Sequence, residues 1–526
     1  MRKDAADGLP DIMQTLPSIT ELVDVENIES IINVLQDIDR HQGSVTIGEA
    51  CHVLLAMVTQ RNVRCSARII KFPLDRRTQC LGFDLPPMWT LSSARVSLYG
   101  PEELLTLTQQ NNPMLIATHS AAHHGRANLV DFKSHQNFEG RVVLYAGTRT
   151  DFSKVIAKAV DSHATGIATS CFSKSVGGKQ ARGRIELPPD SKIFALSLLP
   201  SEMRQLELGL ENAKVVFNVD IDARQTGWMP VVELSLDSDD PREYWLTAHV
   251  CHPRPSANDN ASGVAVAIEI YRMLCLLQAD GFHFPSIRIL LSPEFVGMAA
   301  YLSTISKKPC FVINIDTVGG DIGATGAKLE LELAPNFMSA PQQVRLRQLI
   351  EANAIALSPQ TCTTIPFVGY SDHALFASHG INVPAVQFGQ SSDPYNHTDL
   401  DRIDNLSLPQ LRWLVALITQ YLHEEASSHD PPPASCTLAN KTYQAPFNIR
   451  RLLPMLNEED RQFVENNFAS RKTTFRDLQY IWLLFQRETS IKTIMEKIID
   501  VFPDTDRTTM ERYVKKIADV TPTRLI

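Results

Sequence analysis

The sequence predicts an α/β protein with a mainly parallel, mixed sheet, a smaller inserted α/β domain and a C-terminal helical domain. Short apolar runs at residues 244–250, 287–291 and 311–315 have the length of buried strands, and a His, Glu or Asp residue ends or closely follows each run. The carboxyl ends of parallel strands meet at one edge of a sheet, where ligands bind. Residues 445–526 show a helical pattern, which predicts the C-terminal helical domain.

The N-terminal part predicts two helices and a strand. Apolar residues recur at helical spacing from residue 28 to 35 and again from 50 to 58, and an apolar stretch at 63–72 favours a strand. We assign residues 1–90 to the domain that carries the mixed sheet.

Residues 91–225 are predicted to form the inserted domain. Two buried strands, at 140–146 and 166–170, flank a helix at 152–162, and this order is typical of a βαβ step. The main domain then resumes over residues 226–425, with a further strand at 231–236.

Two helices and a linker complete the main domain. Residues 264–277 and 408–425 carry long apolar helical patterns. Residues 426–444 contain a run of Ser and Pro, which predicts a linker.

The segment 445–526 predicts helices joined by a short turn, as in a winged-helix or helix-turn-helix module. One helix is expected near residues 491–499, and Thr508–Glu511 has the spacing of a capping box for a second. The segment holds fourteen Lys and Arg against twelve Asp and Glu, whereas DNA readers are plainly basic. Docking of a protein or peptide is therefore favoured over binding of nucleic acid.

Length and composition limit the function classes. A chain of 526 residues exceeds one ordinary domain, and its 44% hydrophobic and 21% charged content is typical of globular proteins. The formal charge of −9 disfavours general binding to nucleic acid or anionic membranes. The charged N-terminus predicts no secretory signal, and the apolar runs are too short to span a bilayer. Nine scattered cysteines favour free thiols and a cytoplasmic location.

The most informative segment runs from His249 to Gly263. An imidazole ends an apolar run, and the Asp259 carboxylate follows ten residues later, where a loop enters a helix. Zinc accepts both imidazole nitrogen and carboxylate oxygen. Glu294, Asp316 and His397 follow later in the chain, most of these acidic or imidazole residues coming after short apolar stretches, which predicts a metal site.

Six motifs in this order resemble the zinc-dependent aminopeptidases of the bacterial leucyl aminopeptidase type, a family that includes the glutaminyl cyclases. They lie between about residues 245 and 405, and are His249-x-Cys, Asn258-Asp-Asn-Ala-Ser-Gly263, Glu294-x-x-Gly297, Asn314-Ile-Asp316, Ser371-Asp-His373 and Tyr395-x-His397-Thr. Residues 91–225 also resemble the protease-associated insert of some members of this family.

The resemblance implies roles for individual residues. His249, Asp259 and Asp316 would bind a first zinc ion, and Asp259 would bridge to a second one bound by His397. Glu294 stands at the position of the general base, which deprotonates the metal-bound water that attacks an amide carbonyl.

Three more residues are supporting candidates. Asp372 resembles a residue that contacts the ligands rather than the metal. The family often has Tyr directly before its last His; here Asn396 stands there and Tyr395 one step earlier. Either side chain could stabilise the oxyanion of the reaction.

The chain departs from the family at two positions. Phe295 replaces a glutamate that usually binds the second zinc, and Cys251 replaces the aspartate that usually supports the first His. His252 is the one nearby residue that could compensate. These departures predict one tightly bound zinc and leave the second site open.

Each candidate also has an ordinary structural alternative. His249 could be a core histidine, Asp259 a helix cap, Glu294 a buried structural carboxylate and Asp316 a turn residue. For Cys251 and His252, packing at the strand end is the more common role.

The interpretation that accounts for most of these residues is that the protein is a zinc-dependent aminopeptidase or related amide hydrolase acting on a peptide or small amide. Two alternatives remain open. One is a single-zinc acyl transferase of the glutaminyl cyclase kind. The other is a non-catalytic scaffold that binds peptides.

Overall fold

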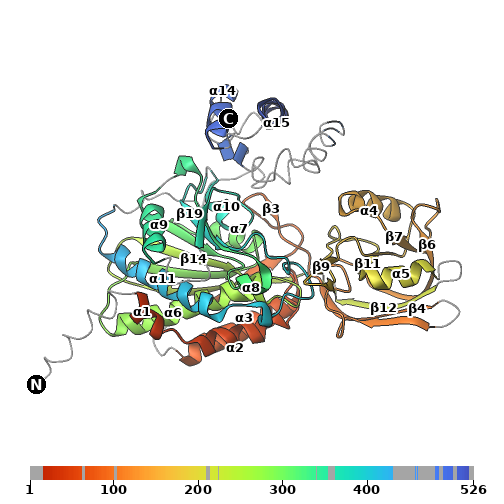
Figure 1. The fold of residues 1–526 in the computed structure, drawn as a ribbon, viewed down its shortest axis with the longest axis horizontal. Coiled ribbons are helices and arrows are strands. Elements are labelled where there is room, and N and C mark those ends of the chain that lie inside the picture. Colours follow the sequence, from red (N-terminus) through yellow and green to blue (C-terminus); the bar gives the residue numbers. More distant parts are fainter. Residues whose placement is uncertain are drawn as a thin grey trace, which may run out of the picture.

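The protein is described here from a computed structural model (Figure 1). It describes residues 16–61, 66–99, 103–208, 214–222, 224, 226–338, 340–353, 362–378, 380–430, 490–501 and 506–520, with residues 457, 459, 462, 480, 481, 483 and 484.

An eight-stranded mixed sheet forms the centre of the larger lobe. Its spatial order is β1-β13-β15-β14-β16-β19-β17-β18. The strands are β1 (Ser66–Leu74), β13 (Gly227–Leu236), β14 (Glu243–His249), β15 (Ser286–Ser292), β16 (Phe311–Ile315), β17 (Leu329–Glu332), β18 (Cys362–Ile365) and β19 (Ala385–Gly389). Strands β15, β14, β16 and β19 run parallel to one another, whereas β1, β13 and β17 pair antiparallel with neighbours. The predicted large mixed sheet is thereby confirmed.

Helices cover both faces of this sheet (Figure 1). One face packs against α1 (Leu16–Glu21), α2 (Val25–Gln36), α3 (Val45–Arg61), α6 (Gly263–Ala279), α9 (Pro341–Asn353) and α11 (Leu408–Ala426). The other packs against α7 (Val296–Leu302) and α10 (His373–Phe376). Side chains alternate along β13: Val232 and Leu234 enter the first core, while Met229 and Val231 enter the second. The helices predicted near residues 28–35, 50–58, 264–277 and 408–425 are confirmed by α2, α3, α6 and α11.

The buried position of helix α6 accounts for its apolar sequence. The segment Ala257–Ala279 has the length and composition of a membrane span, yet 83% of its apolar window is buried inside the protein. It contacts α2 and α11 on one side and strands β13 to β16 on the other. Burial on nearly all sides requires an almost uniformly apolar helix.

A seven-stranded sheet forms the smaller lobe, drawn at the right of Figure 1, in the order β11-β8-β7-β6-β12-β4-β5. Its strands are β4 (Thr90–Tyr99), β5 (Glu103–Thr108), β6 (His123–Asp131), β7 (Val142–Tyr145), β8 (Gly166–Thr169), β11 (Phe194–Ser197) and β12 (Lys214–Asp222). Helices α4 (Phe152–Asp161) and α5 (Pro200–Leu208) and the hairpin of β9 (Lys174–Val176) and β10 (Lys179–Ala181) complete it.

The predicted βαβ step is confirmed, because α4 joins the parallel strands β7 and β8. The antiparallel strands β4, β5 and β12 were not predicted. The chain leaves the first sheet after β1 and returns to it at β13. The short strands β2 (Gln79–Cys80) and β3 (Phe83–Asp84) lie on the outgoing path. The likeness of residues 91–225 to a protease-associated insert stays a prediction.

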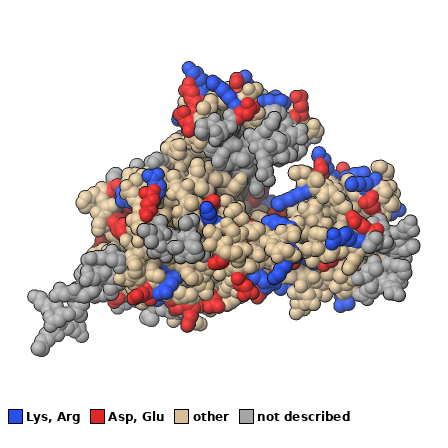
Figure 2. Space-filling view, in the orientation of Figure 1, with Lys and Arg blue, Asp and Glu red and all other residues tan. Residues whose placement is uncertain are grey.

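Two C-terminal helices, α14 (Ile491–Val501) and α15 (Arg507–Val520), pack together through Ile494, Ile498, Met510 and Val514. The predicted capping box at Thr508 is wrong, because α15 begins at Arg507 and the Asp506 carboxylate accepts a hydrogen bond from Thr509 N at 2.9 Å. On the face drawn in Figure 2, basic and acidic side chains are interspersed over these helices.

Most of the remaining C-terminal segment and the linker residues 431–444 lie outside the described residues. The winged-helix arrangement and its protein or peptide partner therefore stay predictions.

Helix α8 (Ile322–Thr325) follows β16 and begins at Asp321, whose side chain accepts hydrogen bonds from Gly323 N and Ala324 N.

Candidate metal centre

Five side chains gather where strands of the large sheet end. His249 is the last residue of β14 and His252 follows three residues later. Asp259 lies in an irregular helical turn that leads into α6, Asp316 follows β16, and His397 lies between β19 and α11. They form two groups that could hold a metal ion, and within each group the ligand atoms lie within 4.8 Å of one another.

Asp259 belongs to both groups and presents a different oxygen to each. Its Oδ1 lies 3.2 Å from His249 Nε2, which is also 3.2 Å from Asp316 Oδ1. Its Oδ2 lies 3.2 Å from His252 Nε2 and 3.1 Å from His397 Nε2. One carboxylate is therefore positioned to bridge two ions.

Two of the imidazoles turn Nε2 toward these carboxylates. His249 Nδ1 lies 3.0 Å from the Cys251 carbonyl oxygen, and His252 Nδ1 lies 2.7 Å from that of Pro253. A carbonyl oxygen only accepts, so each Nδ1 carries a proton, and Nε2 presents a lone pair when the ring is neutral. Each Nε2 faces a carboxylate oxygen, and the His252 Nε2 is buried without a hydrogen-bond partner among the described residues. A neutral ring and a carboxylate at this distance require a cation between them, either a second proton on the ring or a metal ion.

The protonation equilibria agree with a cation site. Burial lowers the pKa of an imidazole, yet the Asp316 and Asp259 carboxylates raise the pKa of His249 well above its usual value. Burial would raise the pKa of Asp259, but His252, His249 and His397 hold it well below the usual range. Burial lowers the pKa of His252, and it lowers that of His397 to about 4. The second group therefore consists of neutral imidazoles and an ionised carboxylate, the forms that bind metal.

Asp401 holds the backbone of the segment around Asp259 through hydrogen bonds. The Asp401 carboxylate accepts hydrogen bonds from the backbone N of Asn258 at 2.7 Å and of Asp259 at 3.0 Å. The Asn258 amide in turn donates to Asp393 at 2.6 Å and accepts from Gly319 N at 2.7 Å. These contacts fix the backbone that carries the Asp259 carboxylate.

Asn260 and Gly263 tie the same segment to the end of β16. Asn260 Oδ1 accepts from Gly263 N and from Thr317 N, both at 3.0 Å. A Cβ atom on Gly263 would lie 2.3 Å from the Ile315 carbonyl oxygen. This position therefore requires glycine, and the close approach brings Asp316 beside Asp259.

Glu294 stands beside the two groups on the loop between β15 and α7. Its side chain is half-buried, and burial raises the pKa of its carboxyl to about 7, with Asp316 and Asp259 adding to the effect of burial. Its backbone is held from both sides: Glu294 N donates to Cys251 Sγ at 3.1 Å, and Gln42 Nε2 donates to Glu294 O at 3.0 Å. A carboxyl that titrates near neutrality is suited to accept and return a proton.

The remaining sequence candidates occupy supporting positions. The Cys251 carbonyl oxygen lies 3.0 Å from His249 Nδ1 and the Cys251 thiol 3.9 Å from it, and the thiol belongs to neither group. Asp372 Oδ1 accepts from Phe295 N at 2.6 Å, and burial raises the pKa of Asp372 to about 8. The Phe295 ring stacks on Phe83 at 6.5 Å between centroids.

Tyr395 and Asn396 precede His397 without a described contact to the two groups. Asn396 O accepts a hydrogen bond from Lys174 Nζ at 2.7 Å, and Asn396 Oδ1 is buried without a partner among the described residues. The oxyanion role of either side chain stays a prediction, as do the roles assigned to the ligands and to Glu294.

Sequence reasoning missed two residues that build the centre. Asp401 lies four residues after His397, and the acidic character of that segment was its only signal. Arg40 is fully buried; its Nε donates to Val250 O at 2.7 Å, and its backbone forms a bridge with His252. Nothing local in the sequence indicates this contact across more than two hundred residues.

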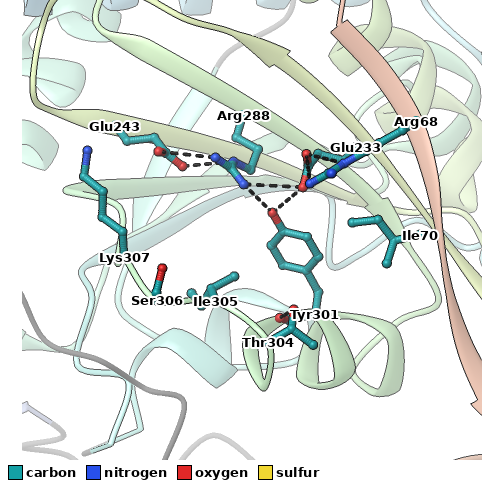
Figure 3. A pocket seen from close by; sticks show the side chains of 10 residues that line it. All are labelled: Arg68, Ile70, Glu233, Glu243, Arg288, Tyr301, Thr304, Ile305, Ser306 and Lys307. Atoms are coloured by element: carbon teal, nitrogen blue, oxygen red, sulfur yellow. Dashed lines mark hydrogen bonds and ion pairs between the residues drawn. The ribbon is translucent and has the colours of Figure 1, made fainter.

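A second charged cluster lies apart from this centre, in a pocket lined by residues of β1, β13, β14, β15 and α7 (Figure 3). Glu233 accepts from Arg68 Nε at 2.9 Å and from the Tyr301 hydroxyl at 2.5 Å. Arg288 lies 3.0 Å from Glu243 and donates to Tyr301 at 2.7 Å. Both carboxylates of this cluster therefore face an arginine.

Comparison with known proteins bears on the fold. Residues 195–424 match the model of a family described as a domain of unknown function (DUF4910). No curated protein matches the chain.

Several solved structures share the fold. A putative peptidase from Clostridium acetobutylicum is 13% identical with a TM-score of 0.56, covering 98% of this chain and 99% of that one. BSAP, a zinc aminopeptidase from Bacillus subtilis, is 16% identical with a TM-score of 0.56, covering 78% and 97%. A peptidase M28 precursor from Shewanella amazonensis SB2B is 14% identical with a TM-score of 0.54, covering 81% and 100%. The chain therefore has the fold of zinc aminopeptidases.

Proposed function

We propose that this protein is a zinc-dependent aminopeptidase or a closely related amide hydrolase. The observation that carries the proposal is the set of imidazole nitrogens that face carboxylate oxygens at 3.1–3.2 Å around Asp259. Solved zinc aminopeptidases with the same fold support zinc as the ion and an amide as the substrate.

The donor set fits zinc at two positions. His249, Asp259 and Asp316 would hold one ion, and His252, His397 and Asp259 the other. Three protein ligands leave a fourth position open, as in catalytic zinc sites. His252 would replace the glutamate whose position Phe295 occupies. Because His249 is 4% exposed and the His397 side chain 40%, we expect tighter binding at the first position.

The protein residues around the centre would manage the protons of the hydrolysis. Bound zinc would supply acidity to a water molecule and polarise the amide carbonyl. Glu294, with a pKa of about 7, would take the proton of the attacking water and deliver it to the leaving amine. The Glu294 backbone, which donates to Cys251 Sγ and accepts from Gln42 Nε2, would hold the residue at the edge of the centre during both transfers.

We expect the substrate to carry a free α-amine. The lone pair of a neutral amine nitrogen can bind zinc, which accepts nitrogen donors. The nitrogen of an acylated amine has no such lone pair available.

The test is hydrolysis of leucine p-nitroanilide and of its N-acetyl derivative by the zinc-loaded protein. We expect cleavage of the free-amine substrate and negligible cleavage of the acetylated one. Equal rates would identify a general amidase or deacylase. Absence of hydrolysis, with cyclisation of an N-terminal glutamine peptide, would identify an acyl transferase. The cytoplasmic location also stays a prediction.

A further inference from the structure

Arg184, in the smaller lobe, lies against the segment that carries His397. Gly183 and Thr398 form an antiparallel bridge between the two lobes. On either side of it, Arg184 N donates to His397 O at 2.9 Å and Asp399 N donates to Arg182 O at 3.0 Å. The register therefore sets Arg184 directly opposite His397.

These paired backbone groups bring Arg184 to the His397 side of the metal centre. The positive charge of Arg184 acts on residues of the centre. After burial, it is the next cause that lowers the pKa of His397, and it also lowers the pKa of His252 and Glu294.

Arg184 differs from its neighbour Arg182 in its partners. Arg182 is buried, and its guanidinium bonds both oxygens of Glu202, at 2.9 and 3.0 Å. Arg184 is half-buried, and its guanidinium has no ion pair or hydrogen bond within the described residues. A half-buried cation without a counterion is suited to receive an anion from solution.

The place of Arg184 indicates which part of a ligand it would meet. His249 is 4% exposed, while the His397 side chain is 40% exposed, so the centre opens to solvent on the His397 side. Arg184 belongs to neither metal-binding group. An anionic group of a ligand at the centre would therefore meet it beyond the ions, at the open side.

We propose that Arg184 determines specificity by binding a carboxylate on the leaving residue of the substrate, next to the scissile amide. This inference rests on the proposed hydrolase function. The carboxylate can be the free C-terminus of a dipeptide or an acidic side chain in a longer peptide. Both offer two oxygens to the paired N–H groups of a guanidinium.

The experiment compares three substrates: Leu-Gly, which has a free C-terminal carboxylate; Leu-Gly amide, which has none; and Leu-Asp amide, which has only a side-chain carboxylate. Each is assayed with the zinc-loaded protein and its Arg184→Gln and Arg184→Lys variants. Arg126→Gln is the matched control, because Arg126 is an exposed arginine of the same lobe.

We expect Arg184→Gln to lower kcat/KM for the carboxylate substrates by about 10- to 100-fold more than for Leu-Gly amide, as for loss of a hydrogen bond to a charged group. Arg184→Lys keeps the positive charge but lacks the paired N–H groups of the guanidinium, so it should recover part of the loss. Arg126→Gln should change none of the three. A loss confined to Leu-Gly would assign the C-terminal carboxylate, and one confined to Leu-Asp amide the side chain.

Binding separates this inference from the hydrolase proposal. In the Glu294→Gln background, calorimetry measures the affinity for Leu-Gly without turnover, and Arg184→Gln should weaken it by a similar factor. Unchanged affinity, or equal loss of kcat/KM for all three substrates, would overturn the role of Arg184. Failure of the wild-type protein to hydrolyse any of them, with Leu-Gly still bound through Arg184, would overturn only the hydrolase function.

Discussion

The metal centre and the charged pocket of Figure 3 are both clusters of ionisable side chains on the same eight-stranded sheet, yet they are built differently. In the pocket, arginines and a tyrosine hydroxyl surround Glu233, so that donors face acceptors. In the centre, the neutral imidazole of His252, whose Nδ1 already donates to a carbonyl, faces the Asp259 carboxylate, so that an acceptor faces an acceptor.

The difference shows which cluster requires a ligand. An arrangement of matched donors and acceptors is complete and contributes to stability. An arrangement of acceptors is incomplete until a cation occupies it. The position on the sheet agrees: His249 is the last residue of its strand and the other residues of the centre lie beyond the strand ends, whereas Glu233, Glu243 and Arg288 belong to strands.

The largest effect is expected from Asp259→Asn, which removes the charge that both groups share. Zinc content should fall to near zero, and turnover should fall on the order of 10³-fold or more, because the ion contributes several kcal/mol to the transition state. Metal analysis after gel filtration and a leucine p-nitroanilide assay measure the two quantities. Zinc retained at the wild-type level would remove Asp259 from the site.

Glu294→Gln tests the neighbour that would transfer protons without binding metal. Turnover should fall by about 10²–10⁴-fold while zinc content and thermal stability stay unchanged. If the variant loses zinc, Glu294 is itself a ligand, and the general base must be sought elsewhere.

His252→Ala separates the two metal positions. Loss of a residue that only supports a metal ligand costs about 10–100-fold in metal affinity. Because His252 would be a ligand itself, its loss should lower the affinity for the second zinc ion by more than this factor. The first zinc ion should remain bound. Titration with a chromophoric chelator measures both affinities. Two tight equivalents in this variant would exclude His252 as a ligand.

Glu233→Gln tests the pocket and is expected to have the smallest effect on function. The substitution leaves Arg288, whose side chain is 26% exposed, without one of its acceptors. Arg68 is too exposed for its ion pair with Glu233 to contribute much to stability. The free energy of unfolding should fall by about 1–3 kcal/mol in urea titration, with zinc content and turnover unchanged. Loss of turnover at unchanged stability would make the pocket a functional site.

The sequence predicted those parts of the fold whose signal is local. Uniform apolar runs indicated β14, β15 and β16, and long apolar patterns indicated α6 and α11. The antiparallel strands β4, β5 and β12 were missed, because they pair across gaps in the sequence that no local pattern reveals.

The same limit applies to the metal centre. The motifs around His249, Asp259, Asp316 and His397 indicated residues that the structure brings together. His252 appeared only as a compensating candidate, because its place depends on a bridge to Arg40 from the N-terminal segment. The opposition of Arg184 and His397 depends on a contact between lobes and had no signal in the sequence.

Anomalous scattering at the zinc edge, from crystals of the zinc-loaded protein, tests the central claim most directly. We predict one peak among His249, Asp259 and Asp316 and a second, of lower occupancy, among His252, Asp259 and His397. Absence of a peak at both positions, with these side chains in the arrangement described here, would contradict the claim that the facing acceptors form a metal centre.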